Sequence, residues 1–541
     1  MAFAKKPEHL ARLCVAAKLR FLEYRHPVHG HLKTTASGRF QAHLGLGKVL
    51  ANRGRQTDGP RFVVSNSAVF DHNLHKDCRR GCYPCNFASA TALAPVAGSI
   101  VFLISCSDTM RRSLLTLLLA LAPLPAAAQP RLDALQSEID RRTAAITDKL
   151  TEWRHDIHQH PELSNFEVRT ARLVSDHLKA LGLEVRTEVG GHGVVAVLRG
   201  GKPGPVVALR AEMDALPVVE QVNVPFKSTT KTVYNGVETG VMHACGHDMH
   251  VAMLMGAAEV LTAMKAQIPG TIVFLFQPAE EAPPTGGAGP MIAAGAMDNP
   301  KVEAVFGLHV GAGTFGVVTA VSGSATSAAD LVRIVVHGRQ THGAFPSGGV
   351  DPIVVGSQIV LGLQTIISRQ VNLTTAPAVV TIGAFQGGLR ENIIPDSVWM
   401  IGTVRTLDEG MRALIHERIK RTAEGIAQSG GATATVTITR GYNITTNDAA
   451  LNEKMLPTLR RVAGPTMLQP ASASSAGEDF SLFANRAPGL FLSLKVTPPG
   501  VDATSAINHS PLFQADDRAL PLGARLMANM ALDYMRMGRA Q

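Results

Sequence analysis

Seven polar residues, most of them placed where an apolar run of the sequence ends, carry side chains that can bind metal ions or transfer protons. They are Asp214, Cys245, His247, Glu280, Glu281, His309 and His509. Together they offer a thiolate, imidazoles and carboxylates, the mixed ligand set that suits borderline divalent cations. Because the carboxyl ends of strands in an open α/β sheet form the ligand crevice, residues this far apart in the sequence can converge there.

Each of these residues also has a purely structural interpretation. A single histidine is usually a hydrogen-bonded core or surface residue, and a single cysteine is usually a small buried hydrophobe. The pair Glu280 and Glu281 fits a solvated loop equally well. Their shared position at predicted strand ends nevertheless favours a common site. Cys245 and His247 are two residues apart and can face the same way, since Gly246 lets the backbone bend between them.

The elements that must position these residues form an alternating pattern. Short apolar runs at 194–198, 205–214, 271–281 and 304–310 predict buried strands, and the run at 251–267 predicts a helix. Helices are also expected from about Leu132 to the HPEL motif and over the stretch that ends at Gly182. Buried strands that alternate with helices predict an α/β fold with a sheet covered on both faces.

A different pattern occupies residues 327–443. Its apolar runs follow the order β-α-β-β-α-β, which is the ferredoxin-like arrangement. After it, the helices and strand of residues 444–541 look like a return to the domain formed by residues 132–326. We therefore expect a two-domain protein, with a catalytic domain in two parts, an inserted lid domain and a cleft between them.

The charge distribution argues against nucleic acid as a partner. The formal charge of the chain is +9, but residues 1–109 hold 15 Lys and Arg against 6 Asp and Glu, which leaves the remainder neutral. A neutral body without basic stripes or interleaved aromatic residues lacks the features of phosphate-backbone binding.

Residues 110–128 have the anatomy of a secretory signal peptide. Two arginines follow Met110, an apolar run covers 114–121, and an Ala-x-Ala sequence ends at Ala128. The apolar run is too short to span a membrane. We expect Met110 to be the true start, residues 1–109 to be mistranslated, poorly ordered upstream sequence, and the product to be secreted to the periplasm without membrane insertion. The alternative is a buried apolar helix between two domains.

The cysteines do not indicate a disulfide framework. None follows Cys245, and the other five lie before residue 107, so a mature chain that begins after Ala128 would hold one cysteine. The motif CRRGCYPC, with cysteines 78, 82 and 85, has the spacing of a radical-SAM iron–sulfur loop. No repeating strand–helix barrel follows it, so we interpret the spacing as accidental.

Seven motifs in a fixed order resemble a known family. RAEMDALP, MHACGHDMH, FQPAEE, GLHV, THGAFPSGGVDPI, GLRENIIPD and NHSP occur in the order seen in the M20 metallopeptidases. The resemblance is to the amidohydrolase branch, which includes hippurate hydrolases and plant auxin-conjugate hydrolases. It spans residues 132–541 and does not extend to residues 1–109.

The resemblance implies a role for each matching residue. It implies a centre of two divalent metal ions held by Cys245, His247, Glu281, His309 and His509. Cys245 stands where many relatives place a bridging aspartate. Glu280 matches the general base, and Asp214 matches the aspartate that orients a ligand or the base. His342, Asn392 and Arg405 match substrate-binding positions. One departure is Glu212, because the branch often has aspartate there; we expect the centre to tolerate it.

The implied activity is hydrolysis of the amide bond of N-acyl amino acids by a metal-activated water, with zinc, manganese, cobalt or nickel as the cofactor. Two alternatives remain open at this point. One is a dipeptidase or carboxypeptidase of the same superfamily, and the other is a non-catalytic metal- or peptide-binding protein on the same fold. The partner is expected to be a small acyl amino acid or short peptide, and the lid domain could support a homodimer.

Overall fold

The computed structural model describes residues 32–34, 40–44, 47–51 and 134–538. They belong to two compact units. The first contains a small antiparallel sheet in the order β1-β2-β3, with bounds Leu32–Thr34, Phe40–Leu44 and Gly47–Ala51. The signal-peptide segment 110–128 and the CRRGCYPC motif lie outside the described residues.

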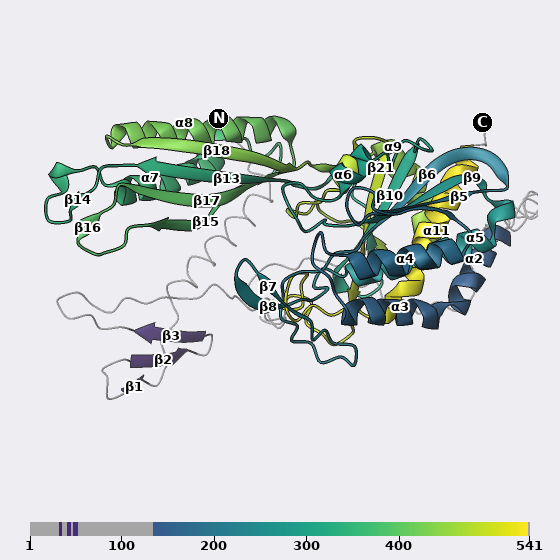
Figure 1. Cartoon of the computed structure of the whole chain (residues 1–541). Coiled ribbons are helices and arrows are strands. Elements are labelled where there is room, and N and C mark those ends of the chain that lie inside the picture. The colour runs from purple at the N-terminus through teal and green to yellow at the C-terminus, as the bar shows by residue number, and fades with distance from the viewer. Residues whose placement is uncertain (1–31, 35–39, 45–46, 52–133, 539–541) are drawn as a thin grey trace, which may run out of the picture. The chain divides into compact units, whose positions relative to one another are not determined.

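The second unit is built on an eight-stranded mixed sheet (Figure 1). Its order is β20-β11-β21-β10-β6-β9-β5-β4. The strands are β4 (Glu184–Arg186), β5 (Val194–Arg199), β6 (Lys202–Glu212), β9 (Pro269–Gln277), β10 (Ala304–Thr314), β11 (Val318–Thr319), β20 (Leu468–Gln469) and β21 (Gly489–Thr497). The central strands β9, β6, β10 and β21 are mutually parallel, so their carboxyl ends meet at one edge. The predicted mixed α/β fold is confirmed.

Helices cover both faces of this sheet. They are α2 (Ala134–Ala145), α3 (Thr147–Gln159), α4 (Val168–Ala180), α5 (His247–Ala263), α6 (Ala288–Ala293), α9 (Ala449–Ala463), α10 (Phe480–Ala484) and α11 (Leu520–Met537). Side chains on successive strand positions point to opposite faces, which separates two cores. Leu209 and Phe274 belong to the core under α5 and α11, whereas Ala208 and Val273 belong to the one under α6 and α10. The single long helix expected from Leu132 is divided at Ile146, where the backbone leaves helical geometry.

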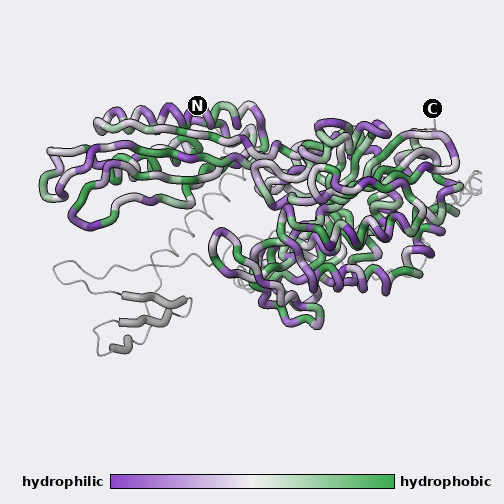
Figure 2. The backbone as a smooth tube through the Cα atoms, viewed as in Figure 1, coloured by the Kyte–Doolittle hydropathy of each residue, from purple (hydrophilic) through white to green (hydrophobic). Residues whose placement is uncertain are grey.

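The inserted domain is a four-stranded antiparallel sheet covered by two helices. The strand order is β15-β17-β13-β18. In chain order the elements are β13 (Ala328–His337), α7 (Pro352–Thr365), β15 (Ala378–Gly387), β17 (Ser397–Thr406), α8 (Glu409–Ser429) and β18 (Thr433–Tyr442). This is the predicted β-α-β-β-α-β arrangement. Figure 2 shows hydrophilic and hydrophobic residues alternating along α8, as expected for a helix with one buried face.

Two capping aspartates fix where the lid helices begin. The carboxylate of Asp351 accepts from the backbone N–H groups of Ile353 and Val354, and that of Asp408 accepts from Met411. A side-chain acceptor at this position satisfies backbone donors that the first helical turn leaves free. Helix α7 continues into the π-helical turn η5 (Ile366–Gln370). The combined helix is the one described helix long and apolar enough to cross a membrane, and it packs its buried residues on the lid sheet.

Short elements complete the second unit. They are β7 (Lys231–Tyr234), β8 (Val237–Gly240), β12 (Gly323–Thr326), β14 (Thr341–His342), β16 (Ile393–Ile394), β19 (Thr445–Asn447), η3 (Lys265–Gln267), η4 (Pro346–Gly348) and η6 (Asp517–Ala519). β12 precedes the lid, β19 follows it, and the two pair antiparallel with Gly323 opposite Asn447. The chain therefore enters and leaves the lid through adjacent strands, which is how one domain is inserted in another.

Candidate metal centre

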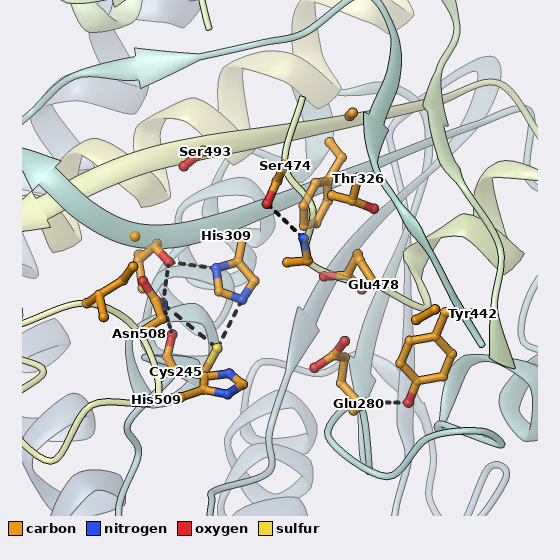
Figure 3. A pocket seen from close by; sticks show the side chains of 18 of the residues that line it. Cys245, Glu280, His309, Thr326, Tyr442, Ser474, Glu478, Ser493, Asn508 and His509 are labelled. Atoms are coloured by element: carbon orange, nitrogen blue, oxygen red, sulfur yellow. Dashed lines mark hydrogen bonds between the residues drawn. The ribbon is translucent and has the colours of Figure 1, made fainter. Parts of the chain in front are cut away.

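The five residues predicted as metal ligands converge at the carboxyl ends of the parallel strands. Cys245 Sγ lies 3.4 Å from His309 Nε2, and His509 Nε2 lies 2.9 Å from Glu281 Oε1. One ligand atom each of Cys245, Glu281 and His509 fall within 4.8 Å of one another. The same holds for His247, Glu280 and Glu281, so Glu281 joins the two groups. Figure 3 shows Cys245, His309 and His509 gathered beside the cavity, with Glu280 facing it from another segment.

Gly246 allows Cys245 and His247 to flank one sharp bend at the start of α5. Its φ of 88° lies in the left-handed region that favours glycine. A Cβ at this position would stand 2.4 Å from Val310 Cγ2, so close packing also requires glycine. The predicted role of Gly246 as the bending residue agrees with this geometry.

Backbone carbonyls orient two of the histidines. His247 Nδ1 lies 2.8 Å from the Asp214 carbonyl oxygen, and His309 Nδ1 lies 2.6 Å from that of Val310. Each Nδ1–H therefore donates to a carbonyl, which leaves Nε2 with its lone pair. His247 Nε2 is buried and has no hydrogen-bond partner among the residues that the structure describes. A buried nitrogen without a partner that faces the carboxylates of Glu280 and Glu281 fits a metal-ligating imidazole.

Asp214 lies behind the ligands and positions them. Its Oδ2 accepts from the Ser164 hydroxyl at 2.6 Å and from the Glu281 backbone N–H at 2.9 Å. Its Oδ1 is 3.2 Å from His247 Nδ1. Because one carboxylate contacts both His247 and the backbone of Glu281, it fixes their relative placement. Asp214 is thus a positioning residue, in agreement with the orienting role that the resemblance implies.

The negative charges of the neighbouring carboxylates favour a cation in this cluster. Burial, together with Glu281 and Glu280, raises the pKa of the Cys245 thiol far above its ordinary value. Burial and the neighbouring Glu478 likewise raise the pKa of Glu280. Burial lowers the pKa of His309, which keeps this imidazole neutral and able to act as a ligand. Although burial opposes it, the hydrogen bond to Asp214 and the charge of Glu212 raise the pKa of His247 to about 10, so this imidazole releases a proton when it binds a cation. A thiol, carboxylates and imidazoles that lie this close together are a donor set that divalent cations stabilise.

His250, in the same motif, does not serve as a ligand. His250 Nδ1 lies 2.8 Å from Glu212 Oε2, and its Nε2 accepts from the Val310 backbone N–H at 2.8 Å. Both ring nitrogens are therefore occupied. Glu212 in turn is paired with the buried guanidinium of Arg210. The glutamate at this position takes part in a buried ion-pair network, and the five candidate ligands still converge.

Sequence reasoning missed the acidic pair Glu478 and Asp479, which precedes α10 and of which Glu478 lines the cavity. Arg210 Nη2 donates to Glu478 at 2.8 Å and to Asp479 at 2.9 Å. Asp479 also accepts from the Gln277 side chain and from two backbone N–H groups. Because Glu478 Oε1 and both Asp479 oxygens already accept hydrogen bonds, we interpret the pair as the partner of Arg210 rather than as a metal site. The sequence GEDF resembles the Glu280–Glu281 doublet, and this likeness was the available sequence signal.

Two more residues outside the predicted set hold the cavity wall. The Tyr442 hydroxyl donates to the carbonyl oxygen of Glu280, and Figure 3 shows this contact. The Asn508 amide donates to the carbonyl oxygens of Cys245 at 3.0 Å and Val310 at 3.1 Å. Asn508 thus ties the Cys245 turn to β10, while Tyr442 ties the lid to the loop that carries Glu280.

The predicted substrate-binding residues fall into two places. Arg405 lines the same cavity of about 990 Å³ as Cys245 and Glu280. His342 and Asn392 do not line that cavity; they lie at the paired strands β14 and β16. Arg405 is paired with Ala329, near the first residue of β13. His342 follows β13 in the chain, so it lies beyond the opposite end of this strand. A ten-residue strand spans about 30 Å, so a single chain does not bring His342 to the cavity in this conformation.

The fold and the site together define a class of protein. Thiol, imidazole and carboxylate groups converge where parallel strands end, beside a large cavity that an inserted domain helps to line. A buried carboxyl group that is free to exchange protons, Glu280, stands beside them. This combination defines a metal-dependent hydrolase.

Comparisons with known proteins identify the family. The model of peptidase family M20/M25/M40 matches residues 208–533, and the chain belongs to this family. It is 40% identical to thermostable carboxypeptidase 2 of Saccharolobus solfataricus, over 72% of this chain and 96% of the relative. It is 36% identical to IAA-amino acid hydrolase ILR1-like 2 of Arabidopsis thaliana, over 73% and 87% of the two chains. The Bacillus subtilis YXEP protein, described as a dinuclear metal-binding peptidase, superposes with a TM-score of 0.61 at 32% identity, over 73% of this chain and 99% of that one.

Proposed function

We propose that this enzyme hydrolyses the amide bond of N-acyl amino acids at a centre of two divalent cations. Zinc, manganese, cobalt and nickel all suit the donor set. The observation that carries the proposal is the convergence of Cys245, His247, Glu281, His309 and His509 beside the free carboxyl group of Glu280. The similarity to an IAA-amino acid hydrolase supports the acyl amino acid as substrate.

The two neighbouring glutamates have different tasks in this proposal. When bound, the cations would polarise the amide carbonyl and lower the pKa of water in the site. Glu281 is placed as a ligand, at 2.9 Å from His509. Glu280 acts as the general base that takes a proton from the attacking water and delivers it to the leaving amine. Burial and Glu478 raise the pKa of Glu280, which helps this carboxyl group to hold the proton between the two steps.

Arg405 is proposed to hold the carboxylate of the amino-acid half. Its guanidinium lines the cavity, and no carboxylate among residues 134–538 pairs with it in the structure. The nearest acid, Asp330, is already engaged by Arg412, His416 and the Gly441 N–H. A carboxylate group on the substrate would supply the missing charge.

His342 is proposed to act on the cavity of a second copy. Its position at the end of the lid sheet opposite to Arg405 makes delivery within one chain difficult. The lid also exposes apolar side chains on α7 and on the edge strand β15, namely Ile353, Val354, Leu361, Val379 and Phe385. We therefore propose a homodimer through the lid, in which His342 donates to the developing oxyanion and Asn392 contacts the substrate.

Export to the periplasm is also a proposal, supported by the anatomy of residues 110–128. It predicts that expression from Met110 yields an exported chain that begins near Gln129. A cytoplasmic product that retains residues 1–109 would contradict it.

The alternatives differ in substrate and in turnover. A carboxypeptidase is favoured by the likeness to thermostable carboxypeptidase 2, and a non-catalytic binding protein would bind metal without hydrolysis. The presence of both Glu280 and Asp214 argues against loss of turnover.

The decisive experiment assays metal-loaded protein on N-acetyl, N-benzoyl and indole-acyl amino acids beside unblocked dipeptides. We expect faster cleavage of the acyl amino acids. Glu280→Gln should reduce kcat by roughly 100- to 10,000-fold, because it removes the proton acceptor, while bound metal stays unchanged. A loss of metal in this variant would mean that the roles of the doublet are exchanged. Tight metal binding without hydrolysis of any substrate would favour the non-catalytic alternative.

A further inference from the structure

Lys495, on strand β21 beside the ligand-bearing strand β10, places a positively charged side chain in the cavity. In the parallel pair of β10 and β21, His309 is opposite Ser493 and Gly311 is opposite Lys495. Side chains two residues apart on a strand share a face, so Lys495 follows Ser493 on the same face of β21. Both residues line the cavity together with His309 and Gly311. The ammonium group is thus within the reach of a substrate bound at the centre.

The neighbouring strand leaves space for this side chain. A Cβ at Gly313 would meet Lys495 Cδ at 3.0 Å and Cγ at 3.1 Å, which shows that the lysine stem packs directly over this glycine. A Cβ at Gly311 would stand 3.2 Å from Lys495 Nζ. The small residues of the segment Gly311–Ala312–Gly313 therefore leave room for the stem and the ammonium group of Lys495.

Among the residues that the structure describes, none provides an anionic partner for Lys495. No ion pair or side-chain hydrogen bond is formed by its ammonium group, and burial alone lowers its pKa. A partly buried cation without a counter-ion is costly, and such a group usually acquires a partner. Arg405, on the lid strand β17, is the other cation of the cavity that lacks a carboxylate. The cavity therefore offers two positions for substrate anions, whereas an ordinary N-acyl amino acid has one carboxylate.

We propose that the enzyme prefers N-acyl amino acids that carry a second carboxylate, and that Lys495 binds this group while Arg405 binds the α-carboxylate. The inference rests on the proposed function and makes its substrate class narrower. The second carboxylate can belong to the side chain of the amino acid or to the acyl group. A carboxylate from either source would bind the ammonium group of Lys495 in the same way. Pairs of ligands that differ in one carboxylate show which source the enzyme prefers.

The test measures binding to the metal-loaded full chain carrying Glu280→Gln, so that the ligands are not consumed. One arm compares N-acetylglutamate with N-acetylglutamine. The other compares N-succinylalanine with the analogue in which the carboxylate of the succinyl group is an amide, so that both ligands of each arm keep the α-carboxylate. In at least one arm we expect the diacid to bind about tenfold or more tightly than the neutral amide, as a charge-assisted hydrogen bond provides. Lys495→Met keeps the apolar stem and should remove that preference while binding of the neutral amides stays the same.

Two further variants separate recognition from packing. Gly311→Ala retains the positive charge but places a methyl group against Nζ, and it should weaken the diacid preference several-fold. Lys420→Met removes an exposed lysine from α8, outside the cavity, and should leave the preference intact. Equal binding of diacids and amides by the parent, or an equal loss for both ligand types in Lys495→Met, would overturn the inference.

Hydrolysis by the protein with Glu280 intact is assayed in parallel on the same four compounds. If none is cleaved but the Lys495-dependent preference is present, the proposed function fails and the diacid site stands. If the amides are cleaved as well as the diacids and Lys495→Met changes neither, the proposed function stands and the Lys495 inference fails.

Discussion

At the scale of single residues, the hydrogen bonds of the ring nitrogens distinguish His247, a candidate ligand, from His250. His247 and His250 occur in one short motif, and both are buried. His247 uses Nδ1 for a backbone carbonyl and its Nε2 has no partner in the described part of the chain, whereas His250 uses both nitrogens. A ring nitrogen that accepts from a backbone N–H has no lone pair left for a cation, so the structure gives a physical reason to assign His247 as a ligand and not His250.

The buried carboxyl group of Glu167, near the metal centre, makes the stability of the fold depend on pH. Glu167 Oε1 accepts from the Ala279 backbone N–H at 2.8 Å, in the loop that leads to Glu280. Burial, with a contribution from Asp214, raises the pKa of Glu167 to about 7. Because the folded pKa lies above the unfolded one, the stability due to this group is complete below about pH 4.5 and is lost as the pH rises through 7.

Glu167→Gln should therefore flatten this part of the pH profile. The amide oxygen can still accept from Ala279, but it no longer loses a proton. Relative to the parent, the variant should gain on the order of 3 kcal/mol in the free energy of unfolding between pH 4.5 and 8. Urea denaturation across this range, at constant metal content, measures the difference. Parallel profiles for the two proteins would show that Glu167 is already ionised at low pH in the folded state.

At the scale of elements, a buried ion pair joins the first strand of the lid to its outer helix. Arg412 of α8 donates through Nε to Asp330 of β13 at 2.8 Å, and both side chains are buried. His416 Nε2 and the Gly441 N–H complete the set around this carboxylate. The pair lies where the lid meets the cavity, so it holds the end of β17 that carries Arg405.

Arg412→Met should destabilise the lid, because it leaves the carboxylate of Asp330 buried without its main partner. The expected loss in the free energy of unfolding is about 3–5 kcal/mol. Arg421→Met, which removes an exposed pair with Glu417 on the same helix, should cost less than about 0.5 kcal/mol. Chemical denaturation of the two variants gives the comparison. Similar small losses for both would show that the buried pair is not important for the lid.

Periodicity predicted the elements better than it predicted their relations in space. The strands β6, β9 and β10 and the lid order follow from apolar runs, and strand ends located the ligand cluster. The network of Arg210 with Glu478 and Asp479 joins positions more than 260 residues apart, and no local pattern reports such a pairing. The distance of His342 from the cavity depends on strand length and register, which a motif match does not contain.

At the scale of the whole molecule, the inserted lid separates Arg405 from His342 and Asn392, the three predicted substrate-binding residues. Arg405 belongs to the cavity of its own chain, and His342 lies beyond the opposite end of β13. A homodimer through the lid would complete each cavity with residues of the other copy. The proposed assembly therefore predicts that one chain can supply what another lacks.

Mixing two inactive variants tests this arrangement. His342→Ala and Glu280→Gln should each lose most activity as pure proteins. After joint refolding or exchange of subunits, a mixed dimer would contain one cavity with both native residues, so up to about a quarter of the native activity should return. Mixing Glu280→Gln with Glu280→Ala is the control and should restore nothing. If the first mixture also stays inactive although mixed dimers form, His342 serves its own chain.

The central claim is that the five converging residues bind two cations per chain, and elemental analysis of purified protein tests it most directly. After metal loading and dialysis, the account predicts two equivalents of divalent metal for each native chain. Cys245→Ser should retain clearly less, since the hydroxyl group is a poorer ligand than the thiolate that the cations stabilise. A native chain that retains no stoichiometric metal, or a Cys245→Ser chain that retains the full two equivalents, would contradict the account.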